Sequence, residues 1–276
     1  ESCPNPSLRI FPIKEVADIG RKHGIPLIID NTAAPVICRP LEHGAAIVMH
    51  SLTKYIGGHG TTIGGIIVDG GNFDWAANPK RQPLFNEPDP SYNGAIWGRD
   101  VPKMTGANVA FAIRARVVLL RDLGAPLSPF NAFQIIQGLE TVAIRMKQHC
   151  ANAEKVVKFL ETQKKVKNVI YPTNHQGEIR DRAKRYMKGG YGSLVGMDLG
   201  SLEAGSKFIN NLKLLYHVAN IGDARSLAIH PASTTHGQLN EKQLAEAGVT
   251  PGYVRLSIGI EHPDDIIADI EQALAA

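Results

Sequence analysis

The sequence predicts an α/β fold with a mainly parallel sheet, and three observations predict it. Two short apolar runs, residues 25–29 and 45–49, are each followed by polar residues. Apolar runs of about five residues with turn signals on both sides are typical of buried strands in parallel sheets. A helical pattern precedes the first run, and a third apolar run, residues 63–68, follows a glycine-rich turn. This alternation of strands and helices indicates an α/β architecture.

The first helix is expected directly after Pro12, because proline suits the first helical turn. Gly24 suits its C-terminal cap. The residues that give this helix an apolar face are Ile13, Val16, Ala17 and Ile19.

Residues 72–104 interrupt the alternation. This segment is rich in proline, asparagine, aspartate and aromatic residues, and we interpret it as a long insertion or surface excursion. Its aromatic residues predict that it is ordered. Three helices are expected next, at 108–123, 131–148 and 152–163, and the last two can form one long, bent connecting helix.

Beyond these helices the pattern changes to short strands and helices, which predicts a second, smaller α/β domain. The strands are expected at 166–171, 194–199, 226–229 and 254–258, and the helices at 202–212 and 263–274. We therefore predict a large domain over residues 1–142 and a small C-terminal domain over residues 143–276.

Composition excludes several classes of protein. The 276 residues are 43% hydrophobic and 20% charged, which is typical of a soluble protein with a real core. The apolar runs are too short to span a membrane. A net charge of +4 from scattered lysines and arginines argues against nucleic-acid binding.

Three widely spaced cysteines predict inert thiols in a reducing compartment, the cytoplasm. The histidines show no metal-binding pattern, so no metal site is expected. The first residue is Glu1 rather than Met, and the opening loop predicts that an N-terminal portion is absent.

Polar residues follow both predicted strands, at the edge where parallel sheets bind ligands. Lys54 lies among hydroxyl residues and glycines just past the second strand, where partial burial can make its amine a nucleophile that holds an aldehyde cofactor as a Schiff base. Asp30 ends the first strand and can pair with a protonated ring nitrogen, although turn aspartates are common there. Ser51 and Thr53 can bind a phosphate. The glycine spacing fits neither a Rossmann fingerprint nor a P-loop.

Five segments resemble the Cys/Met-metabolism family of pyridoxal-phosphate enzymes. They are ESCPNPSL, LIIDNT, HSLTKYIGGHG, IHPASTTH and VRLSIGIEHPDDIIADIEQAL, and they occur in the family's order along the whole chain. The resemblance implies the aspartate-aminotransferase-like fold, fold type I, with pyridoxal 5'-phosphate as cofactor.

The resemblance also implies roles for individual residues. Lys54 forms the Schiff base with the cofactor and moves protons, and Asp30 pairs with the pyridine nitrogen. Ser51 and Thr53 bind the phosphate, and Asn5 lies near the phenolic oxygen. Arg255 pairs with the substrate α-carboxylate, although an arginine in a β run is by itself as well explained as an exposed strand residue.

Two features resemble the O-acetylhomoserine sulfhydrylases of this family: the segment GGNFDWAANPKRQPLFNEPDPSYNGAIWG, residues 70–98, and Asn220 in HVANIGDARSL. Asn220 would help Arg255 to hold the carboxylate, and a plain turn residue is its alternative role. The implied reaction replaces acetate on O-acetyl-L-homoserine with sulfide or methanethiol and serves methionine biosynthesis.

Two alternatives stay open: a methionine or cystathionine γ-lyase or a cystathionine γ-synthase of the same family, and an inactive fragment that serves only in assembly. The resemblance further implies a homodimer or homotetramer with sites shared between subunits. Its expected partners are small-molecule substrates, with neither nucleic acid nor membrane.

Overall fold

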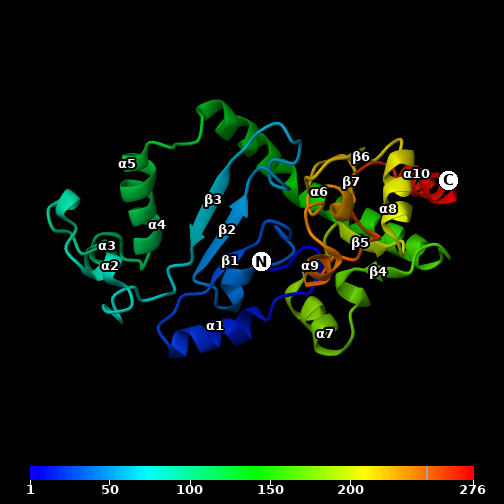
Figure 1. The fold of residues 1–276 in the computed structure, drawn as a ribbon. Coiled ribbons are helices and arrows are strands. Elements are labelled where there is room, and N and C mark those ends of the chain that lie inside the picture. Colours follow the sequence, from blue (N-terminus) through cyan, green and yellow to red (C-terminus); the bar gives the residue numbers. More distant parts are fainter. Residues whose placement is uncertain (247) are drawn as a thin grey trace.

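The computed structural model describes residues 1–246 and 248–276, which form two β-sheets joined by one long helix (Figure 1). The first sheet has the order β1-β2-β3 and consists of β1 Ile28–Asp30, β2 Ile47–Ser51 and β3 Gly65–Asp69. The second sheet has the order β4-β5-β8-β7-β6 and consists of β4 Asn168–Ile170, β5 Leu194–Asp198, β6 Tyr216–His217, β7 Leu227–Ile229 and β8 Tyr253–Ser257.

The helices lie around these sheets and between them. They are α1 Ile13–Lys22, α2 Pro83–Asn86, α3 Trp97–Thr105, α4 Ala110–Arg114, α5 Arg121–Leu123, α6 Pro129–Glu161, α7 Gly177–Tyr186, α8 Leu202–Asn211, α9 Glu241–Glu246 and α10 Pro263–Ala275. A π-helical segment, Ala115–Leu120, joins α4 to α5. The helix predicted over residues 108–123 is therefore present as one helical stretch from Ala110.

The α/β class is confirmed, but the strand pairing is mixed rather than mainly parallel. β1 and β2 are parallel, with Asp30 opposite Met49. β3 runs antiparallel to β2, with Ser51 opposite Gly65. The connection between them, residues 52–64, contains no helix, whereas a parallel pairing usually needs a helical crossover. Most pairs of the second sheet are antiparallel as well.

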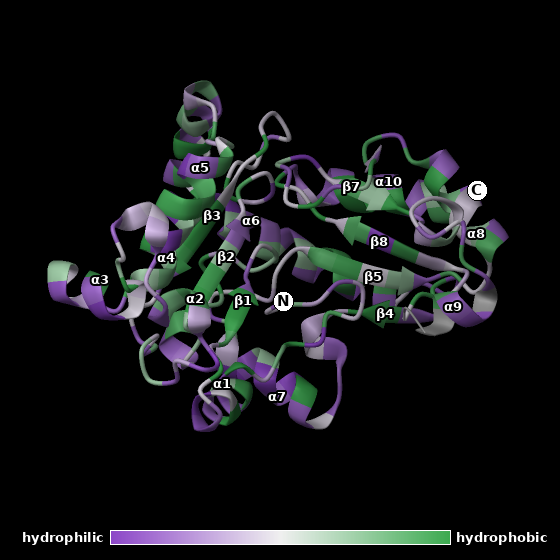
Figure 2. Ribbon diagram, turned by 60° about the vertical axis from the view of Figure 1, so that its left-hand side comes forward, coloured by the Kyte–Doolittle hydropathy of each residue, from purple (hydrophilic) through white to green (hydrophobic). Residues whose placement is uncertain are grey.

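Four helices, α2, α3, α7 and α9, and one strand, β6, were not predicted from the sequence. α7, GEIRDRAKRY, is mostly polar, and only Ala183 and Tyr186 of it are buried. A helix without an apolar stripe gives little periodic signal. Figure 2 shows the contrast, since α7 is mainly hydrophilic whereas β1, β2 and β5 are mainly hydrophobic. β6 has only two residues, which is too short for a recognisable pattern.

α6 is one continuous helix of 33 residues, as the alternative of a single connecting helix anticipated. It passes from the first sheet to the second (Figure 1). The two sheets lie on either side of residue 143 in the sequence, within α6, and the division into two domains at that point stays a prediction. In the described part of the chain, no helix is both long and apolar enough to cross a membrane.

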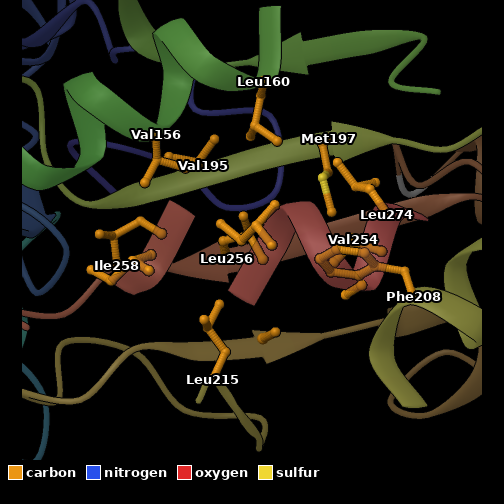
Figure 3. Packing of buried hydrophobic residues seen from close by; sticks show 14 of the residues in the cluster. Val156, Leu160, Val195, Met197, Phe208, Leu215, Val254, Leu256, Ile258 and Leu274 are labelled. Atoms are coloured by element: carbon orange, nitrogen blue, oxygen red, sulfur yellow. The ribbon is translucent and has the colours of Figure 1, made fainter. Parts of the chain in front are cut away.

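The larger core lies on one face of the second sheet, under α6, α8 and α10 (Figure 3). Val195 and Met197 of β5 are two residues apart, as are Val254 and Leu256 of β8, so each pair faces the same side of the sheet. Full burial of each such side chain contributes about 1.5–3 kcal/mol. This core fixes the position of β8, on which a candidate site residue lies.

The excursion over residues 72–104 is ordered, as predicted. Trp75, Phe85 and Trp97 are buried together in a cluster that also contains Ala46 and Ile47 of the first sheet. The Trp97 indole donates to the Asp89 carboxylate at 3.0 Å. The aromatic residues therefore attach this segment to the edge of the first sheet.

His149 of α6 gives a prediction about acid stability. Its Nδ1 donates to the Ile258 carbonyl at 2.7 Å, and its Nε2 is buried without a partner among the described residues. Burial lowers the pKa of His149 to about 4, below the usual 6.5. The unfolded chain therefore binds a proton first as the pH falls, so stability is lost between about pH 6.5 and pH 4.

We expect this histidine to remove roughly 2–3 kcal/mol from the free energy of unfolding between pH 7.5 and pH 4.5. His149→Asn, whose amide can still donate toward Ile258, should lack this part of the loss. Denaturant unfolding of both proteins at the two pH values measures the difference. An equal loss in wild type and variant would contradict the assignment.

Candidate active site

The carboxyl ends of β1 and β2 meet at one edge of the first sheet. The Ser51 N–H donates to the Thr32 hydroxyl at 2.7 Å, and the Thr32 N–H donates to Asp30 Oδ1 at 2.8 Å. These bonds tie the turn after β1 to the last residue of β2. The structure thus places Asp30 and Ser51 on the same edge, which is where the chain continues to Lys54.

Lys54 contacts a residue in the loop between β6 and β7 of the second sheet. Its Nζ donates to Asn220 Oδ1, across 166 residues of sequence. The Asn220 carbonyl in turn accepts from Arg255 Nη2 at 3.1 Å. Asn220 therefore bridges the lysine and the arginine, and three of the residues predicted from sequence lie together.

The surroundings of Lys54 favour its neutral amine. Partial burial, followed by the positive charge of Arg255, lowers the pKa of Lys54 below its usual value. A neutral amine carries the lone pair that attacks a carbonyl carbon. The lowered pKa of Lys54 therefore favours a nucleophilic role for this amine.

Arg255 occupies the middle of the second sheet, on β8, opposite Gly196 of β5 and Ile229 of β7. Its Nε is buried and has no hydrogen-bond partner among the described residues. Burial lowers the pKa of Arg255, although a guanidinium stays charged at neutral pH. A half-buried guanidinium with an unused donor suits a carboxylate, which it can hold through two parallel hydrogen bonds.

The remaining predicted residues lie nearby without joining this cluster directly. Thr53 is half-buried, and its hydroxyl accepts from the Gly64 N–H at 3.1 Å, so this group is engaged with the turn before β3. Ser51 is half-buried beside it. Its hydroxyl has no partner in residues 1–246 and 248–276, which leaves it able to bind a phosphate oxygen.

Asn5 is exposed, and within residues 1–246 and 248–276 its side chain forms no hydrogen bond with the other predicted site residues. The turn that carries it nevertheless lies between the two sheets. The Ser2 N–H donates to the Asp30 carbonyl at 2.9 Å, and the Tyr253 hydroxyl donates to the Pro6 carbonyl at 3.3 Å. The turn is thus fixed beside β1 and β8, both of which carry candidate residues.

Neither Thr32 nor Arg145 was predicted from the sequence to be a site residue. A single threonine after a strand carries no distinctive signal. Arg145 does carry one, because it lies on the buried face of α6, next to Met146 and one turn from Val142, on a face that also buries His149 and Asn152. A charged residue on such a face indicates a buried cation with specific partners.

An amine of lowered pKa, a strand-end carboxylate, hydroxyls and a guanidinium form a donor set that fits a phosphorylated aldehyde cofactor and an amino-acid substrate. The described residues contain no group of three or more His, Cys, Asp or Glu side chains that could hold a metal ion.

Comparison with known proteins gives a consistent result. The family described as "Cys/Met metabolism PLP-dependent enzyme" matches residues 1–275. An O-acetyl-L-homoserine sulfhydrylase of Leptospira meyeri is 50% identical over 281 residues, covering 99% of this chain and 63% of the relative. A homocysteine synthase of Schizosaccharomyces pombe is 45% identical over 277 residues, covering 99% of this chain and 63% of the relative.

A crystal structure of a putative O-acetylhomoserine (thiol)-lyase from Campylobacter jejuni superimposes with a TM-score of 0.90 at 40% identity, covering 100% of this chain and 65% of that one. That structure holds an N'-pyridoxyl-lysine-5'-monophosphate residue. The chain described here thus spans 63–65% of the length of these three proteins.

Proposed function

This chain belongs to the family of Cys/Met-metabolism enzymes that depend on pyridoxal phosphate, and from that premise we propose that its protein replaces the acetoxy group on the γ-carbon of O-acetyl-L-homoserine, which leaves as acetate. Sulfide or methanethiol is the incoming group, and homocysteine or methionine and acetate are the products. The observation that carries the proposal is the contact of Lys54 with Asn220 and of Asn220 with Arg255. The names of the relatives at 45–50% identity support the choice of substrate.

Pyridoxal phosphate, when bound, supplies an electron-accepting ring that stabilises negative charge on the substrate carbon next to the amino group. Lys54 would hold the aldehyde carbon through its amine and, once the substrate amine had displaced it, would move protons at the substrate α-carbon. The lowered pKa of Lys54 supports both tasks, because each needs the neutral amine. Asp30 holds the proton of the ring nitrogen.

The other residues bind and orient. Arg255 and Asn220 hold the α-carboxylate of the substrate, beside Lys54. Ser51 and Thr53 would hold the phosphate, and Asn5 would face the phenolic oxygen. Such positioning of reactants by several side chains can lower a barrier by several kcal/mol.

We extend the proposal to assembly and location. Large apolar side chains are exposed along α6, which supports a homodimer or homotetramer; they are Phe130, Phe133, Ile136, Leu139 and Ile144. All three cysteines are free and buried, which supports the cytoplasm as the compartment. The large domain is assigned to residues 1–142 and the small domain to residues 143–276.

A product assay tests the proposed function. With O-acetyl-L-homoserine and sulfide, the purified protein loaded with pyridoxal phosphate should form homocysteine and acetate in equal amounts. With methionine or cystathionine alone, it should release little 2-oxobutyrate. Faster release of 2-oxobutyrate than of homocysteine would identify a γ-lyase instead, and no product from any of these substrates would contradict the proposal.

A further inference from the structure

Arg145 is a buried arginine that no carboxylate faces. Its side chain is 6% exposed, and in the described part of the chain it takes part in no ion pair. Burial disfavours the charged form of a side chain, and it lowers the pKa of Arg145 accordingly. Since an unpaired buried cation is costly, its hydrogen bonds must offset that cost.

The partners of Arg145 are the backbone oxygens that follow Lys54. Nη1 donates to the Tyr55 carbonyl at 2.6 Å, and Nη2 donates to the Ile56 carbonyl at 2.9 Å. Nη2 also donates to the Gly138 carbonyl at 2.7 Å, and Nε donates to the Thr141 hydroxyl at 3.1 Å. The guanidinium therefore joins α6 to the two residues directly after the lysine.

The Lys54 loop, residues 52–60, packs so closely against α6 that the two backbones are in contact at Gly57 and Gly138. A Cβ on Gly138 would lie 2.4 Å from the Gly57 carbonyl oxygen, so only glycine fits at this point of the helix. A Cβ on Gly58, whose φ is +73°, would lie 2.2 Å from Arg145 Nη1. The loop consequently has no room to shift toward the helix.

Two further contacts hold the loop from the side of the second sheet. The Tyr55 side chain is fully buried, and its hydroxyl shares a hydrogen bond with Ser193 Oγ at 2.7 Å, just before β5. The Gly58 carbonyl accepts from the Ala224 N–H at 2.8 Å. The backbone around Lys54 is thus fixed by α6 on one side and by the second sheet on the other.

We propose that Arg145 is a positioning residue for Lys54: by fixing the carbonyls of Tyr55 and Ile56, it sets where the lysine amine stands relative to Asn220 and the cofactor. This inference rests on the proposed role of Lys54 as the residue that binds the cofactor. Lysine in place of Arg145 would keep the charge but would lack the planar fork that reaches several carbonyls at once. A displacement of the amine by about 1 Å is enough to cost up to 100-fold in rate.

The test compares Arg145→Lys, Thr141→Val and the wild type, all loaded with pyridoxal phosphate. For Arg145→Lys we expect kcat to fall by about 10- to 100-fold with KM changed by less than about 3-fold. We also expect the pH midpoint of the visible band of the lysine-bound cofactor to shift by about 0.5 unit or more, because the surroundings of the amine change. Thr141→Val, which frees only Nε, should shift both quantities in the same direction by a smaller amount.

Arg185→Lys is the matched control, because Arg185 is an exposed arginine paired with Glu15 at 2.7 Å. It should behave as wild type. Arg145→Lys that unfolds at a lower temperature but keeps the wild-type band and kcat would overturn the inference and leave a purely structural role. If Arg145→Lys does not fold, unchanged spectra and kcat in Thr141→Val would overturn it. A wild-type protein without any such band would overturn the proposed function itself.

Discussion

Lys54→Ala is expected to abolish the visible absorption of bound pyridoxal phosphate and to lower turnover of O-acetyl-L-homoserine by at least about 1,000-fold. Lys54 is the amine proposed both to bind the cofactor aldehyde and to move protons at the substrate, so one substitution removes both functions. Absorption spectra and single-substrate kinetics on the purified variant measure the effect.

Lys14→Ala serves as the control for this substitution. Lys14 lies on α1, is exposed and pairs with Asp18 at 2.7 Å, so its loss should leave spectrum and turnover unchanged. Exposed ion pairs of this kind contribute about 1 kcal/mol or less to stability. A Lys54→Ala protein that kept the wild-type band would remove this lysine from the mechanism.

Arg255→Leu is expected to lower kcat/KM for O-acetyl-L-homoserine by about 100- to 1,000-fold. The substitution removes the guanidinium proposed to hold the substrate carboxylate, and loss of a partly buried charged pair costs about 2–5 kcal/mol. Arg255→Lys keeps the charge without the bidentate geometry and should recover only part of the rate. Steady-state kinetics on both variants give the values.

The carboxyl amide of the same substrate makes this prediction specific. Wild type should use the amide poorly, and Arg255→Leu should lose little further activity toward it, because the charged group that Arg255 holds is missing. Arg99→Leu, which removes an exposed arginine of α3, should leave kcat/KM for both substrates unchanged. An equal loss for substrate and amide in Arg255→Leu would show that the arginine acts on folding and not on the carboxylate.

Elements with a strong local signal were predicted well from the sequence. The first helix has Pro12 before it and an apolar face, and the last has Pro263 at its start and Asp264 and Asp265 in its first turn, so both agree with prediction within a residue or two. The direction of β3 was not predictable in the same way, because it depends on the connection between strands and not on the strand's own residues.

In the candidate site, too, residues with a local signal were predicted, and contacts between distant segments were not. Lys54, Asp30 and Ser51 follow buried strands, and that position alone indicated a shared edge. The contact of Lys54 with Asn220 joins residues far apart in sequence, and only the packing of the two sheets around α6 brings them together. Arg145 was missed although its place on the buried face of α6 is a signal, because the sequence does not show its partners, which are mostly backbone carbonyls.

Chemical trapping of the cofactor tests the central claim most directly. The purified protein is incubated with pyridoxal phosphate, reduced with borohydride, digested and analysed by mass spectrometry. In the wild type, only the peptide that contains Lys54 should gain the mass of the reduced cofactor. In Lys54→Ala, no peptide should gain it. Labelling of a different lysine would contradict the proposed role of Lys54. So would a folded protein in which Lys54 stays unlabelled.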